Sequence, residues 1–143
     1  MQRKEFIKSC SMICIGGIGL LESCSSSNYY AQNTISNNRI TLKKSEFVQV
    51  KTDGNIQRNY VLIKIDKYKY PLCIYKLDES NYSALLMRCS HKGCELNPQG
   101  DFLVCPCHGS EFSNKGVVQN PPAEQNLTIF TTTSDNENIY ILL

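Results

Sequence analysis

The sequence has no Trp, only two His and no long apolar run, and each of these scarcities excludes something. Its 143 residues fit one domain, and 41% hydrophobic residues with 9% aromatic residues can bury one modest core but not two. A non-haem iron oxygenase site needs two His and a carboxylate. That chemistry is therefore excluded if both histidines serve another site.

Neither positive nor negative charge is concentrated in one part of the chain. The 15 Lys and Arg are interspersed with 13 Asp and Glu, and the formal charge is +2. Without a basic stripe, a nucleic-acid partner is not indicated, and no small-molecule substrate is evident. Eight Cys are many for an ordinary cytosolic domain but too few for a disulfide-built mini-protein.

Residues 1–23 are predicted to be a signal peptide. Arg3, Lys4 and Lys8 form a basic start, and an apolar run of 12 residues extends from Cys10 to Leu21. A membrane span needs about 20 apolar residues. The run is therefore typical of the hydrophobic region of a signal peptide rather than of a transmembrane helix.

The end of this segment, Leu21-Glu22-Ser23-Cys24, resembles a lipobox and predicts lipidation at Cys24. Glu22 departs from the small or apolar residue usual there, so an uncleaved anchor, or Cys24 as an ordinary thiol, stays open. Residues 24–38 are predicted to be the lipidated cysteine and a flexible polar tether. We expect an exported lipoprotein, anchored to the membrane and facing the periplasm or the outer surface.

The export route is suggested by residues 2–8. This segment resembles a twin-arginine signal in which Lys4 replaces the second arginine. Such a route would suit a protein that folds around a cofactor before export.

Residues 39–143 are predicted to form one all-β domain, an antiparallel sandwich or barrel. Short runs rich in Val, Ile, Tyr and Leu alternate with turn residues at close spacing, and no stretch has the period of a long helix. The expected strands are Glu46–Lys51, Asn59–Ile65, Leu72–Lys76, Ser83–Arg88, Phe102–Cys105, Leu127–Thr132 and Asn138–Leu143.

Two short boxes contain both histidines and four of the eight cysteines. They are Cys89-Ser90-His91-Lys92-Gly93-Cys94 and Cys105-Pro106-Cys107-His108-Gly109-Ser110. Each box offers one Cys and one His at short spacing, as C-x-H and C-x-x-H. Two tight loops of this kind that face each other make a four-ligand metal site.

The boxes resemble those of the Rieske iron–sulfur family, in which two Cys hold one iron and two His hold the other iron of a [2Fe–2S] cluster. The resemblance implies one such cluster, and a small cluster-binding subdomain at about residues 86–122. It also implies the cytochrome bc-type branch, in which a disulfide braces the two loops. The residues carried over are Cys89 and Cys105 as thiolate ligands, His91 and His108 as imidazole ligands, and Cys94 with Cys107 as the disulfide.

Three further positions bear on function. Ser110 matches the family serine that donates a hydrogen bond to a bridging sulfide, whereas Phe112 replaces a Tyr that donates to a cysteine sulfur. We therefore expect a reduction potential below that of quinol-oxidising members. Lys92 replaces an apolar residue at the tip that docks on a quinol site, and a hydrated ammonium is costly to bury there.

The resemblance thus implies a carrier of single electrons to or from a membrane or periplasmic oxidoreductase, whose redox partner is unknown. The alternative is the Rieske subunit of a quinol-oxidising cytochrome bc-type complex. A stand-alone enzyme is less expected than either.

Three other interpretations of the boxes are a zinc site, two structural disulfides, and thiol redox chemistry at Cys105-Pro106-Cys107. Cys73, in an apolar strand, is expected to be a buried free thiol.

Overall fold

The computed structural model describes residues 28–143, and within them the chain is nearly all β. One 3₁₀ helix, η2 (Lys44–Phe47), interrupts a series of short strands. The strands are β1 (Asn33–Ser36), β2 (Arg39–Lys43), β3 (Val48–Gln49), β4 (Ile56–Gln57), β5 (Tyr60–Ile63), β6 (Leu72–Lys76), β7 (Tyr82–Leu86), β8 (Asn97–Gln99), β9 (Phe102–Val104), β10 (Glu111–Ser113), β11 (Val118–Asn120), β12 (Ile129–Phe130), β13 (Thr132–Ser134) and β14 (Asn138–Leu142). The all-β class expected from the sequence is confirmed.

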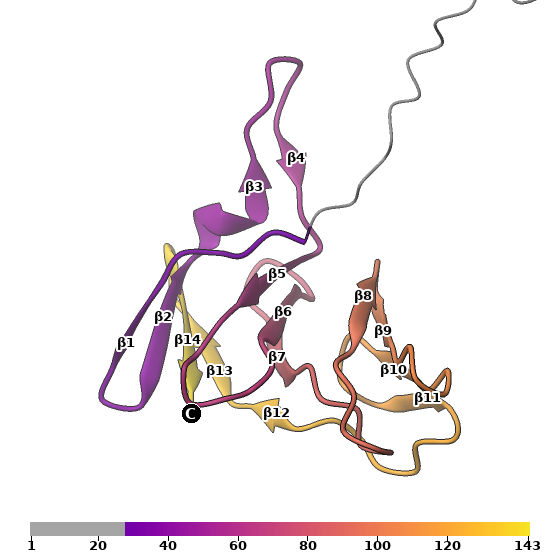
Figure 1. Ribbon diagram of the computed structural model, residues 1–143. Coiled ribbons are helices and arrows are strands. Elements are labelled where there is room, and N and C mark those ends of the chain that lie inside the picture. Colours follow the sequence, from indigo (N-terminus) through magenta and orange to yellow (C-terminus); the bar gives the residue numbers. More distant parts are fainter. Residues whose placement is uncertain (1–27) are drawn as a thin grey trace, which may run out of the picture.

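The strands form three four-stranded antiparallel sheets, and one of them lies between the other two (Figure 1). The outer sheet has the order β1-β2-β14-β13, the central sheet has the order β12-β7-β6-β5, and the small sheet has the order β11-β10-β9-β8. Strands β3 and β4 form a separate hairpin. Both Cys/His boxes flank strands of the small sheet, so this sheet lies within the subdomain expected at about residues 86–122.

The central sheet is buried on both of its faces. Along β6, Leu72 and Ile74 pack in the core shared with the outer sheet, whereas Cys73 and Tyr75 pack in the core shared with the small sheet. Alternate side chains of a strand point to opposite faces, so two buried faces require an unbroken apolar run. This explains why these strands are continuously hydrophobic rather than alternating, and it confirms Cys73 as a buried free thiol.

The amino-terminal boundary of the domain differs from the sequence prediction. Residues 33–36, expected to lie in a flexible tether, form β1 and pair with β2 from Asn33↔Leu42 to Ser36↔Arg39. Further upstream, the Ala31 amide donates to the Leu62 carbonyl at 2.8 Å. The sequence of β1 is mostly polar and therefore gave no apolar strand pattern. The position of this strand is determined by its backbone pairing with β2 rather than by apolar burial. The predicted signal peptide and Cys24 lie outside the described residues.

Two turns are built by aspartate side chains. Asp135 Oδ1 accepts hydrogen bonds from the Glu137 and Asn138 amides at 2.9 and 2.7 Å, and its Oδ2 accepts one from the Tyr140 hydroxyl at 2.6 Å. The Tyr140 bond is the largest cause that lowers the pKa of Asp135 to about 2. Asp78 caps its turn in the same way, through the Ser80 and Asn81 amides.

Gly116 lies between β10 and β11, where the small sheet packs against the central sheet. Its replacement gives a first prediction. Its φ is +77°, and a Cβ built there would lie 2.8 Å from Leu85 Cδ2 in the core. We expect Gly116→Ala to cost about 2–4 kcal/mol of unfolding free energy, from left-handed strain and overpacking together. Urea denaturation measures this cost.

Gly100 supplies the control. Its φ is also positive, at +63°, but no atom lies within 4 Å of a Cβ built there. Gly100→Ala should therefore cost only about 1 kcal/mol, the strain alone. Equal losses in the two variants would show that the Leu85 contact is unimportant.

Candidate metal centre

The two boxes close by the same pattern of backbone hydrogen bonds. In each box the carbonyl oxygen of the first Cys accepts a hydrogen bond from the amide of the glycine four residues later. The amide of the same Cys donates to the carbonyl oxygen of the residue that follows this glycine. Both glycines have positive φ, 77° at Gly93 and 79° at Gly109, which L side chains rarely adopt. The bonds are Gly93 N to Cys89 O at 2.9 Å, Cys89 N to Cys94 O at 2.8 Å, Gly109 N to Cys105 O at 3.0 Å, and Cys105 N to Ser110 O at 2.8 Å.

A disulfide joins the boxes. Cys94 at the end of the first is bonded to Cys107 in the second, with their Cα atoms 6.5 Å apart. This is the pair that the resemblance implied, and it leaves Cys89 and Cys105 as free thiols. The interpretation of the four cysteines as two structural disulfides is therefore wrong.

The free thiols of Cys89 and Cys105 meet in the core beneath the boxes. Each residue is only 2% exposed, and the neighbouring Cys89 is one of the groups that raise the pKa of Cys105. Burial is the main cause that raises the pKa of Cys105, while the backbone amides of Cys107 and His108 oppose the shift. These amides can stabilise a thiolate at this position.

The histidines of the two boxes converge as well. The rings of His91 and His108 lie edge to face with their centroids 5.0 Å apart. His91 Nδ1 is the one buried side-chain nitrogen or oxygen within residues 28–143 that lacks a hydrogen-bond partner. A buried polar atom without a partner is costly, and a metal ion bound there would satisfy it. The donor set of two thiols and two imidazoles thus fits a mixed Cys/His metal centre.

A proline segment, residues 121–126, is tied to both boxes. The Ala123 amide donates to Ser110 Oγ at 2.9 Å, and Ser90 Oγ donates to the Gln125 carbonyl at 2.6 Å. Ser110 is fully buried and its oxygen is the acceptor in this bond, so its hydroxyl hydrogen remains available to another acceptor. The bond from Ser90 was not expected from the sequence, because its partner lies 35 residues further along the chain.

The remaining predicted positions fall around the same centre. Phe112 is fully buried in the core that contains Cys89 and Cys105. Lys92 is exposed beside His91, at the surface of the first box. The sulfurs of Cys94, Cys105 and Cys107 lie within 4.8 Å of one another, but two of them are bonded as the disulfide and do not act as metal ligands in that form.

Comparison with known families agrees with this geometry. The model of the Rieske [2Fe-2S] domain matches residues 41–131. The plasma membrane Rieske protein PetC3 of the cyanobacterium Synechocystis PCC 6803 has a similar structure, with a TM-score of 0.53 and 28% identity over 59% of this chain and 87% of that chain.

Two curated relatives match shorter segments. The cytochrome b6-f complex iron-sulfur subunit of Synechococcus sp. (strain CC9605) is 33% identical over 55 residues, which are 37% of this chain and 31% of the relative. The ubiquinol-cytochrome c reductase iron-sulfur subunit of Rickettsia typhi (strain ATCC VR-144 / Wilmington) is 37% identical over 57 residues, or 38% and 32% of the two chains. The match therefore spans about a third of these relatives' length.

Proposed function

Because the chain belongs to the Rieske [2Fe-2S] domain family, we propose that it carries single electrons to or from a membrane or periplasmic oxidoreductase. Its cofactor is one [2Fe–2S] cluster. The observation that carries the proposal is the juxtaposition of two free buried thiols and two converging imidazoles, braced by the Cys94–Cys107 disulfide.

The four ligands divide by chemistry. Cys89 and Cys105 would hold one iron through their thiolates, and the two imidazoles, His91 and His108, would hold the other. The His91 nitrogen without a hydrogen-bond partner supports this assignment, because ligation would satisfy it. The identical backbone closure of the two boxes also supports it, because each loop could then present one Cys and one His to a shared centre.

The cluster supplies one-electron redox chemistry at about −150 to +300 mV, against about −400 mV for all-Cys plant-type ferredoxins. Neutral imidazoles in place of two thiolates leave two fewer negative charges, which favours electron uptake. The chain's own residues adjust this value within the range. The Ser110 hydroxyl, whose oxygen accepts from Ala123, and the amides of Cys107 and His108 would act as donors that favour the more negative, reduced state.

The proline segment limits the access of water to the site. It is held over both boxes by the bonds to Ser110 and Ser90. Exclusion of water lowers the local dielectric and strengthens each hydrogen bond to sulfur.

Electron paramagnetic resonance of the dithionite-reduced protein tests this assignment. Two imidazole ligands are expected to give an average g value near 1.9, lower than all-Cys clusters show. Metal analysis accompanies the spectrum. A silent sample with stoichiometric zinc would overturn the cluster assignment in favour of a zinc site.

Ser110 leads to a prediction on the potential. Ser110→Ala should lower it by about 65–130 mV, the equivalent of one charge-assisted hydrogen bond of about 1.5–3 kcal/mol. Protein-film voltammetry measures the change. Phe112→Tyr is the complementary variant, expected to raise the potential because it adds a donor in the core that holds Cys105. If both variants keep the parent potential, hydrogen bonds from these positions do not tune the cluster.

Membrane attachment is the second part of the proposal. The sequence Leu21-Glu22-Ser23-Cys24 supports lipidation at Cys24 of an exported chain, and a similar solved protein is described as a plasma membrane Rieske protein. Mass spectrometry of the mature amino terminus from membranes tests it. An unmodified Cys24 would contradict the lipid anchor.

The alternative function is the Rieske subunit of a quinol-oxidising complex. It is favoured by the names of the curated relatives, which are subunits of cytochrome b6-f and ubiquinol-cytochrome c reductase complexes. Lys92 opposes it, because a hydrated ammonium at the tip is unfavourable in an apolar quinol pocket. Co-purification of the protein from membranes with a b-type cytochrome would favour the subunit, and purification alone would favour the carrier.

A further inference from the structure

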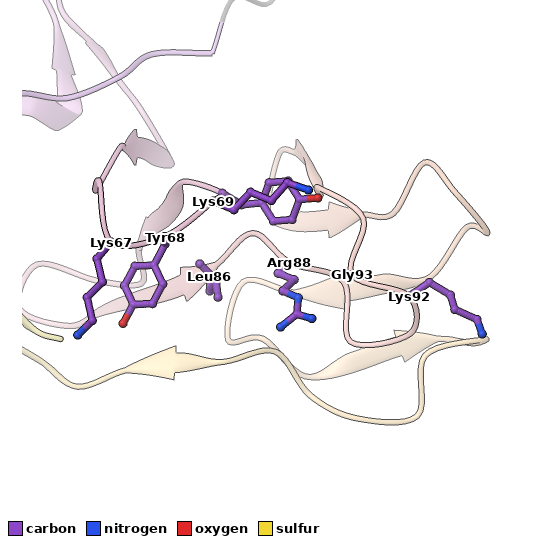
Figure 2. Close-up of a pocket in the computed structure, with 8 residues that line it drawn as sticks. Lys67, Tyr68, Lys69, Leu86, Arg88, Lys92 and Gly93 are labelled. Carbon is purple, nitrogen blue, oxygen red and sulfur yellow. The ribbon is translucent and has the colours of Figure 1, made fainter.

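A cleft of about 340 Å³ lies beside the first box, and its walls are basic. Eight residues line it, of which four are cations and none is acidic. Figure 2 shows Lys67 and Lys69 on the connection between β5 and β6, and Arg88 and Lys92 on the chain that leads into and around the first box. Segments about twenty residues apart thus supply one basic surface.

These cations are not neutralised by neighbours. Among residues 28–143 the single ion pair joins Lys76 and Glu79, away from this cleft. Asp66 and Glu95 do not line this cleft; they line an adjacent one that shares Tyr68, Lys69 and Tyr70 with it. The positive charge is therefore available to a ligand from outside the domain.

The fold holds these side chains in place. Lys67 and Lys69 lie over the rings of Tyr68 and Tyr70, with each Nζ 5.7 and 5.1 Å from the ring centroid. Arg88 lies across Gly93, where a Cβ would come within 3.3 Å of its Nε. The lack of a side chain at Gly93 thus permits the positive φ of the loop, and it also leaves room for the Arg88 guanidinium.

The cleft is continuous with the proposed redox centre. Arg88, Lys92 and Gly93 also line the neighbouring cleft, which contains Cys89 and His91. A partner that covers the basic cleft is thereby brought next to His91. The two aromatic rings and Leu86 between the cations provide apolar contact area within a charged rim, the usual anatomy of a protein interface.

We propose that this basic cleft is the docking surface for an acidic redox partner protein, whose carboxylates contact Lys67, Lys69, Arg88 and Lys92. The inference rests on the proposed electron-transfer function and names the charge of the partner. In each encounter one electron passes between the partner and this domain, so that one is oxidised and the other reduced by one electron and no bond forms. Hydrated lysines suit such brief, electrostatically steered contacts.

An acidic protein fits this surface better than an anionic membrane. Lipid headgroups over Arg88 and Lys92 would also cover the loop that carries His91 and would keep a redox partner away from it. A protein that carries its own redox group satisfies the charge and brings that group to the site at once.

Charge reversal tests the docking surface. The probe is flavodoxin, an acidic protein whose hydroquinone donates one electron at low potential. In stopped flow at low ionic strength, Lys67→Glu/Lys69→Glu should reduce the second-order rate constant at least tenfold and flatten its salt dependence. Binding of oxidised flavodoxin, measured by surface plasmon resonance without electron transfer, should weaken in parallel.

The matched control is Lys43→Glu/Lys51→Glu, which alters the net charge equally at exposed positions outside the cleft. It should change the rate no more than about twofold. Equal slowing by both pairs, or no slowing by the cleft pair, would overturn the proposal. It would also be overturned if the cleft pair lost binding to phosphatidylglycerol vesicles while its flavodoxin rate was unchanged.

Failure of this proposal is distinguishable from failure of the proposed function. The resonance signal of the reduced protein reports the cluster in every variant, whereas the binding measurement reports the surface alone. Loss of flavodoxin binding in the cleft pair with the signal retained supports the docking surface. A wild-type chain that lacked the signal would overturn the electron-transfer function, and with it the redox role of the cleft.

Discussion

A Cys105→Ala chain is expected to lose its cluster, whereas a Cys73→Ala chain is expected to keep it. Both residues are buried free cysteines in the same core. Only Cys105 belongs to a box, where Cys89 and the backbone amides of Cys107 and His108 lie near enough to shift the pKa of its thiol. Cys73 lies on β6, outside both boxes, where burial raises the pKa of its thiol.

Iron and acid-labile sulfide analysis measures the difference. About two irons and two sulfides per chain are expected in the wild type and in Cys73→Ala, and almost none in Cys105→Ala. Circular dichroism shows whether each variant has folded. A Cys105→Ala chain that kept its full iron content would exclude Cys105 as a ligand, and loss of iron in Cys73→Ala alone would move the site to β6.

Removal of the disulfide is the second large effect. Cys94 and Cys107 are 13 residues apart in sequence, and closing a loop of this length stabilises a fold by about 3 kcal/mol. We expect Cys94→Ala/Cys107→Ala to lower the melting temperature by roughly 12–24 °C. The bond also joins the two boxes directly, so we expect the double variant to lose iron faster under chelation.

Differential scanning calorimetry and the rate of bleaching in a chelator measure these changes. The double variant is preferable to either single one, because the sulfur of Cys105 lies within 4.8 Å of both disulfide sulfurs and could pair with a thiol left behind. We therefore expect Cys94→Ala alone to lose more iron than the double variant. A double variant as stable as the wild type would show that the backbone bonds of the boxes suffice.

The chemistry of the site was predictable because it is local in sequence. Each box places Cys and His within six residues, and a glycine at the fifth position permits the left-handed turn that closes the loop. The central strands were predictable for a similar reason, because their continuous apolar runs determine their burial. The short strands of the small sheet were mostly missed, since runs such as Asn97–Gln99 and Glu111–Ser113 contain few apolar residues.

The sequence by itself therefore determined the residue types and the spacing within each box, and the all-β class. Tertiary structure decided which parts meet: the two boxes across the disulfide, Ser90 with the proline segment, β1 with β2, and Lys67 with Arg88 at one cleft. The physical reason is the separation in sequence between the residues that interact. A loop of six residues is set by its own backbone angles and hydrogen bonds, whereas contacts between distant segments depend on packing around the doubly buried central sheet.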